Sequence, residues 1–121
     1  MPDYVVSVLK APTTAVPGQI IDVNDTTKNQ GGGSIASTTT RFYLSTDTKF
    51  SADDIPLQGR VVRPLGFGES SPGSTSVTIS SDTPPKKYYL IAVADNGKAV
   101  DEGSKETNNT KYRAITIKPL L

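Results

Sequence analysis

The sequence predicts an all-β fold, an immunoglobulin-like antiparallel β-sandwich of about seven strands. Three observations predict it. The ordered stretches are short, Thr, Ser, Val and Ile dominate them, and breaks made of Pro, Gly, Asn or Asp separate them at roughly ten-residue intervals. No stretch has the 3.6-residue apolar period of an amphipathic helix, so we expect no helix longer than about two turns. The 121 residues predict a single domain, 1–121, without internal repeats.

The first two predicted strands are separated by Pro17-Gly18. Tyr4–Leu9 stops shortly before Pro12, and Gln19–Lys28 stops before three successive glycines, which favour a turn. In the second strand, the period of two that strands follow places four residues on one face: Ile21, Val23, Asp25 and Thr27.

The middle of the chain predicts three more strands. Thr38–Ser45 is rich in β-forming residues, and we expect Phe42 and Leu44 to face the core opposite the last two strands. A polar loop leads to a weaker strand, Leu57–Arg63, which ends before a proline. Ser74–Ile79 follows, and in it apolar residues alternate with hydroxyls.

The last two strands predict a terminal hairpin. Tyr88–Ala94 is aromatic and apolar, and Lys111–Ile117 alternates between polar and apolar residues. The approach Pro85-Lys86-Lys87-Tyr88 resembles a tyrosine corner, in which the phenol bonds to the backbone just upstream. The alternation of side chains along a strand does not decide which face of Tyr88–Ala94 points inward, because both faces are apolar.

The elbow between these strands, residues 95–109, concentrates carboxylates and carboxamides. Asp95, Asp101 and Glu106 offer the oxygen ligands that calcium prefers, and the first and last of them have the spacing of a twelve-residue calcium loop. The glycine that such a loop needs at its sixth place is Val100, so the EF-hand interpretation fails.

The alternative role for the elbow is structural. Asn108 and Asn109 have side chains that hydrogen-bond nearby backbone, which a long connection without ladder partners needs. We therefore expect no metal and no cofactor, with calcium at the three carboxylates as the alternative.

Two other acidic positions stand out. In the loop 47–54 we expect Asp47 and Asp53 to cap turns, with Phe50 tucked beneath. Asp25 shares a face with apolar residues and needs a hydrogen-bonded or charged partner. Arg41 or Arg113 is expected to supply it, unless a bulge turns the carboxylate outward.

Composition excludes several classes of function. The formal charge is +1, from 13 basic and 12 acidic interspersed residues, so no face for nucleic acid is predicted. The absence of histidine removes the commonest general base, and the hydroxyls lack a partner that would make them nucleophiles. No apolar run approaches the about 20 residues that cross a bilayer, and no signal peptide is visible. No catalytic residue is predicted.

The order of several short motifs resembles the CARDB family, the cell-adhesion-related domain found in bacteria and archaea. The match runs from Pro2 to Ile117 and rests on these motifs: Pro2-Asp3-Tyr4-Val5-Val6, Val16-Pro17-Gly18-Gln19, Lys28-Asn29-Gln30-Gly31, Phe42-Tyr43-Leu44-Ser45, Leu65 with Gly68-Glu69-Ser70, Tyr88-Tyr89-Leu90 and Glu106-Thr107-Asn108-Asn109. The resemblance implies an immunoglobulin-like sandwich without catalytic residues, found singly or in arrays within secreted or surface proteins. By analogy, the inward face of the penultimate strand is Tyr88, Leu90, Ala92 and Ala94.

Two functions follow from this resemblance. In the first, the chain is a non-catalytic, extracytoplasmic binding or adhesion module that contacts a surface protein or a carbohydrate. In the second, it is a passive spacer that presents a neighbouring domain, such as a hydrolase. An exposed aromatic cluster beyond single residues such as Tyr43 or Tyr112 would favour binding, and none is evident in the sequence. We expect a piece of a longer extracellular or cell-surface protein, monomeric in isolation and not inserted in a membrane.

Overall fold

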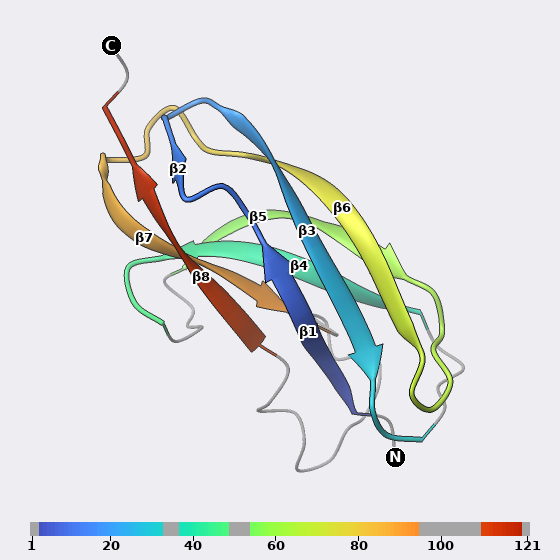
Figure 1. Ribbon diagram of the computed structural model, residues 1–121. Helices are drawn as coiled ribbons and strands as arrows, with labels where there is room; N and C mark the ends of the chain where they lie inside the picture. The colour runs from blue at the N-terminus through green and yellow to red at the C-terminus, as the bar shows by residue number, and fades with distance from the viewer. Residues whose placement is uncertain (1–2, 33–36, 49–53, 95–109, 120–121) are drawn as a thin grey trace.

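The computed structural model describes residues 3–32, 37–48, 54–94 and 110–119 (Figure 1). Within these ranges the chain forms eight strands and no helix: β1 (Tyr4–Lys10), β2 (Thr14–Ala15), β3 (Ile20–Asn29), β4 (Thr38–Ser45), β5 (Ile55–Val62), β6 (Ser70–Thr78), β7 (Lys86–Val93) and β8 (Thr110–Ile117). None of the described segments is a helix able to cross a membrane. The all-β prediction is confirmed.

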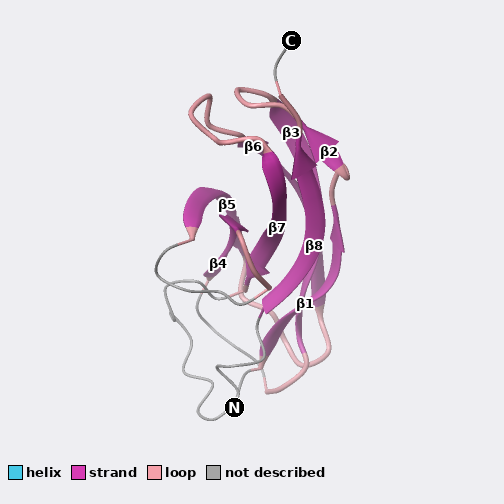
Figure 2. Cartoon of the chain, turned by 90° about the vertical axis from the view of Figure 1, so that its left-hand side faces the viewer, coloured by secondary structure: helices cyan, strands magenta, loops and turns pink. Residues whose placement is uncertain are grey.

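The strands form two sheets that face each other as the layers of a sandwich (Figure 2). One sheet has the order β1-β3-β6, and the other has the order β2-β8-β7-β4-β5. All pairs are antiparallel except β2 with β8, which is parallel. The predicted immunoglobulin-like sandwich is therefore confirmed.

Strand β2 is the element that the sequence did not predict. After β1 the chain leaves the three-stranded sheet and joins the margin of the other one, where Thr116 N donates to Thr13 O (2.9 Å) and Lys118 N donates to Ala15 O (2.8 Å). Two residues are too few to show a period of two, so a strand of this length leaves no pattern in the sequence.

The core lies between the inner faces of the two sheets. Strand β3 contributes the predicted face, Ile21, Val23, Asp25 and Thr27, and all four side chains are buried. Phe42 and Leu44 are buried as predicted. Their predicted neighbours were wrong, because Phe42 pairs with Ala92 and Leu44 with Leu90 within one sheet. The layer that faces them is β1-β3-β6.

The inward face of β7 is the one that the family resemblance implied. Tyr88, Leu90, Ala92 and Ala94 all belong to the core cluster. Ile91 and Val93 on the other face are also buried, but they lie outside that cluster. Parity was uninformative because both faces of β7 carry buried apolar side chains.

The tyrosine corner is confirmed. The Tyr88 hydroxyl donates to the Pro84 carbonyl at 2.8 Å, which ties the start of β7 to the preceding turn. Burial raises the pKa of the Tyr88 phenol, because the charged phenolate is poorly solvated there.

The core position of Phe42 gives the first prediction. Phe42→Ala should lower the free energy of unfolding by about 3 kcal/mol or more, because it removes a fully buried ring and leaves a cavity. Urea denaturation followed by circular dichroism measures the change. Phe67→Ala is the matched control: that ring is 76% exposed, so its loss should cost less than about 0.5 kcal/mol. A Phe42→Ala cost below about 1 kcal/mol would contradict the register of β4.

The tyrosine corner gives a pH-dependent prediction. Because the pKa of Tyr88 is raised on folding, its contribution to stability is complete below the unfolded pKa, near about 10, and is lost as pH rises through the folded pKa. Tyr88→Phe should cost about 1 kcal/mol at neutral pH by removing the bond to Pro84. Urea midpoints between neutral and strongly alkaline pH should show wild type losing its advantage over Tyr88→Phe. A constant difference across that range would contradict the prediction.

Candidate functional site

The elbow that the sequence singled out lies outside the described residues. Asp95, Asp101, Glu106, Asn108 and Asn109 all fall in 95–109, so the calcium and structural interpretations both stay predictions. Its flanks are described: Val93 pairs with Thr110 at the end of the β7–β8 ladder, as the predicted terminal hairpin requires.

The loop after β4 is described only in part. Ser45 Oγ donates to Asp47 Oδ1 at 3.2 Å, and Asp47 N donates back to Ser45 Oγ at 3.2 Å. Asp47 therefore takes part in a turn, as predicted. Asp53 and Phe50 lie outside the described ranges.

Asp25 is a buried carboxylate, and its partner, Arg60, was not predicted from the sequence. Its side chain has no exposed surface, and Arg60 of β5 grips it from the opposite sheet: Nε to Oδ1 at 2.8 Å and Nη2 to Oδ2 at 2.9 Å. Two parallel charge-assisted bonds of this kind are the geometry that best compensates a buried charge.

The two expected partners of Asp25 were wrong. Arg41 Nε donates instead to the Leu57 carbonyl at 2.9 Å, beside the irregular pairing of β4 with β5. Arg113 Nε donates to the Leu9 carbonyl at 2.8 Å. Arg41 alternates with Phe42, so it lies on the outer face of its sheet and points away from Asp25.

Arg60 also fastens β5 to β6. Nη1 donates to Ser71 Oγ at 3.1 Å, and Nη2 donates to the Ser71 carbonyl. The guanidinium passes over Gly73, where a Cβ would lie 2.5 Å from Arg60 Cζ. Only glycine at that place leaves the ion pair undisturbed.

This network holds the fold and offers no reactive group. Asp25 Oδ2 also accepts from Thr27 Oγ1 at 2.9 Å, and Thr27 contacts the Thr40 hydroxyl at 2.6 Å. Both carboxylate oxygens of Asp25 accept hydrogen bonds and the side chain has no exposed surface, so it is not accessible to a substrate. Within the described ranges, no three carboxylates come together as a metal site.

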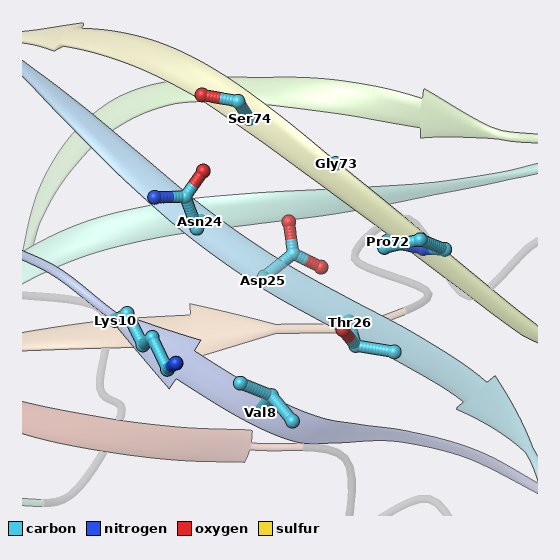
Figure 3. A pocket seen from close by; sticks show the side chains of 8 residues that line it. All are labelled: Val8, Lys10, Asn24, Asp25, Thr26, Pro72, Gly73 and Ser74. Atoms are coloured by element: carbon cyan, nitrogen blue, oxygen red, sulfur yellow. The ribbon is translucent and has the colours of Figure 1, made fainter.

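A hollow of about 560 Å³ lies over the outer face of the three-stranded sheet (Figure 3). It is lined by Val8, Lys10, Asn24, Asp25, Thr26, Pro72, Gly73 and Ser74. None of these lining residues is aromatic. Of the aromatic residues in the described ranges, Tyr4 lies on β1 and Phe67 in a turn, and the others lie on strands of the five-stranded sheet.

The outer face of β7 and β8 carries a tyrosine cluster. The rings of Tyr89 and Tyr112 meet edge to face, with centroids 5.7 Å apart and planes at 89°. Lys87 Nζ lies 5.4 Å from the Tyr89 ring centroid. Ile91 is the cross-strand neighbour of both Tyr112 and Tyr43, so one row across three strands reads Tyr112, Ile91, Tyr43.

A second hollow, of about 480 Å³, adjoins this cluster. It is lined by Thr48, Thr110, Lys111, Tyr112 and Arg113. Tyr112 is half exposed, which makes it the accessible ring of the pair with Tyr89. Residues with hydroxyl, cationic and aromatic side chains therefore line this hollow on the described surface. No local pattern in the sequence indicated that Tyr89 and Tyr112 would be neighbours.

Comparison with known proteins identifies the family. The sequence matches CARDB over residues 1–113. The chain belongs to the CARDB family. CARDB is a family of non-catalytic domains, and the predicted resemblance is confirmed. The comparison with curated proteins found no match.

Two solved CARDB domain structures share the fold. A crystal structure of the CARDB domain of a Pyrococcus furiosus protein, in complex with di-metal ions, is 20% identical, with a TM-score of 0.68 over 96% of this chain and 88% of that one. The solution structure of that Pyrococcus furiosus domain is 21% identical, with a TM-score of 0.70 over 98% and 96%.

The CARDB fold is also similar to a part of larger enzymes. A β-glucosidase from Listeria innocua, solved in complex with glucose, is 12% identical with a TM-score of 0.63. The match covers 97% of this chain but only 16% of the glucosidase. In that protein the fold is thus one part of a much longer polypeptide.

The buried ion pair gives a prediction. Arg60→Ala should lower the free energy of unfolding by about 3 to 5 kcal/mol, because it leaves the Asp25 carboxylate buried and unpaired. Arg63→Ala is the matched control: its pair with Glu69 is 3.4 Å long with both side chains more than half exposed, so we expect about 1 kcal/mol or less.

A double variant separates the charge effect from the loss of packing. Asp25→Val with Arg60→Met removes both charges, so chemical denaturation should place it closer to wild type than Arg60→Ala. Equal losses for Arg60→Ala and Arg63→Ala would show that the inter-sheet pair contributes little.

Proposed function

We propose that this chain is a non-catalytic binding or adhesion module of a larger cell-surface or secreted protein. Membership of a non-catalytic family supports this, as does the similarity of the fold to a small part of a glucosidase. The absence of histidine from the sequence and the burial of the hydrogen-bonded Asp25 carboxylate agree with a module that does no chemistry.

The observation that carries the proposal is the tyrosine cluster. An adhesive copy needs an aromatic cluster larger than a single residue, and here the exposed Tyr112 packs against the half-buried Tyr89 beside a hollow. Tyrosine suits recognition because its ring is rigid and apolar while its hydroxyl bonds to polar partners. The ligand we propose is a surface carbohydrate or protein that lays a polar, ring-containing or extended segment along β8.

A second role, a passive spacer, is favoured by the path of the chain. Strand β1 begins at one end of the sandwich, and β8 finishes at the opposite end (Figure 1). Domains attached before and after it would therefore be held apart along the long axis. A spacer of this kind would present a neighbouring domain, such as a hydrolase, and would need no ligand of its own.

The remaining parts of the proposal follow from the module role. We propose an extracellular or cell-surface location, a monomer in isolation, and neighbouring domains of the parent chain as the constant partners. A formal charge of +1 gives no reason for nucleic-acid binding, and insertion in a membrane is not part of the proposal. Metal is not part of it either, although calcium at the elbow stays the alternative.

Binding and spacing predict different results for Tyr112→Ala. In native gels that contain xylan, a neutral β-glucan or polygalacturonate, at least one polysaccharide should retard the wild-type chain. Tyr112→Ala should weaken that retention roughly tenfold, because it removes the accessible ring of the pair. Phe67→Ala, an exposed aromatic on a different part of the surface, should bind as the wild type does. No retardation, or retention unaffected by Tyr112→Ala, would contradict carbohydrate recognition by this cluster and favour the spacer.

A further inference from the structure

The two sheets differ in charge. Within the strand bounds given above, the five-stranded sheet contains no Asp or Glu and six basic residues: Arg41, Arg60, Lys86, Lys87, Lys111 and Arg113. The strands of the three-stranded sheet contain two carboxylates and two lysines: Asp22, Asp25, Lys10 and Lys28. One set of strands is therefore strongly cationic and the other is balanced, although the formal charge of the whole chain is only +1.

Three of the six cations are directed to the interior of the sandwich or its margins. Arg60 and Arg113 reach across to the three-stranded sheet, and Lys86 Nζ lies 5.4 Å from the ring centroid of the buried Tyr88. Each of the other three accompanies a tyrosine, one pair on each of three neighbouring strands: Arg41–Tyr43 on β4, Lys87–Tyr89 on β7 and Lys111–Tyr112 on β8. The cation lies 5.7 Å from the ring centroid in the first pair and 5.4 Å in the second, and the third pair lines one hollow.

The spacing of these cation–tyrosine pairs suits a chain molecule that extends from β8 across β7 to β4. Tyr112 and Tyr43 belong to one row over those strands. Because neighbouring strands lie about 4.8 Å apart, the backbones of these two residues are about 10 Å apart. An oligosaccharide spans that distance, and its rings present C–H faces to the tyrosine rings. A carboxylate on such a ring accepts charge-assisted hydrogen bonds from the cation beside the tyrosine.

Charge density distinguishes this ligand from other polyanions. Duplex DNA has one negative charge about every 1.7 Å, which three cations distributed over three strands do not match. A polymer of uronic acid has one carboxylate on each sugar ring, so charge and apolar ring faces recur together along it. An acidic peptide has carboxylates but offers the tyrosines no regular series of ring faces.

We propose that the three cation–tyrosine pairs bind an acidic polysaccharide, a polymer whose sugar rings have carboxylates. This rests on the proposed function and names the class of ligand for the tyrosine cluster. Exposed ion pairs contribute little individually, so the three pairs act together through repeated contacts with one polymer chain. Because the Debye length is only about 10 Å at 0.1 M salt, binding should weaken as the ionic strength rises.

The test measures retention in native gels that contain polygalacturonate, its methyl ester or a neutral β-glucan, each compared with a gel without polysaccharide. The methyl ester is the matched ligand, because it keeps the sugar ring and loses the charge, and it should retain the wild type far less than polygalacturonate does. Lys87→Gln with Lys111→Gln should weaken retention by polygalacturonate roughly fivefold. Lys10→Gln with Lys28→Gln is the control, since it removes the same charge from the three-stranded sheet and should bind as the wild type does. Equal melting temperatures for the two double variants exclude unfolding as the cause.

Three results would overturn the proposal: equal retention by polygalacturonate and its methyl ester, equal losses in the two double variants, or retention by polyglutamate as strong as by polygalacturonate. Retention by the neutral β-glucan alone, weakened by Tyr112→Ala, would overturn acidic recognition and leave the proposed function standing. No retention by any of these polysaccharides would contradict carbohydrate binding altogether.

Discussion

The ion pair between Arg60 and Asp25 joins the two sheets on a side where no backbone ladder does so. Strand β5 ends one sheet and β6 ends the other, so this side of the sandwich has two unpaired margins. Arg60 crosses between them, neutralises the buried Asp25 and donates to the Ser71 carbonyl on β6. Gln58 of β5 also bonds to β6, because its Oε1 accepts from Thr78 N at 2.9 Å. Polar side chains thus replace the missing strand partners, which leaves less of the margin open to edge-to-edge aggregation.

On the opposite side of the sandwich, a polar side chain again joins the two sheets. Arg113 of β8 donates to the Leu9 carbonyl on β1, and the two-residue β2 covers the end of β8. At the end where β1 begins, Asn29 uses both oxygen lone pairs and both amide hydrogens, on Asp3, Gly31, Gly32 and Leu65. Buried polar groups that are fully satisfied favour one arrangement over others, because any alternative leaves a donor or acceptor unpaired.

Exposed aromatic residues lie at two places on the described surface. The tyrosine cluster lies on the outer face of the five-stranded sheet, whereas Phe67 lies in the turn between β5 and β6. A spacer needs no ligand of its own and a binding module needs only one accessible surface, so the two roles proposed for the chain are compatible in a single molecule.

The sequence by itself determined the class of fold, seven of the eight strands, the inward face of β3 and the tyrosine corner at Tyr88. Each depends on local chemistry: the period of two, the turn preferences of Gly and Pro, and a bond spanning four residues. The inward face of β7 needed the family pattern, since its two faces are equally apolar. Tertiary structure alone decided that β4 lies beside β7, that Arg60 rather than Arg41 or Arg113 pairs with Asp25, and that Tyr89 meets Tyr112. These contacts join residues up to 52 positions apart, as in the pairing of Arg41 with Val93, through strand order and register, which no local pattern encodes.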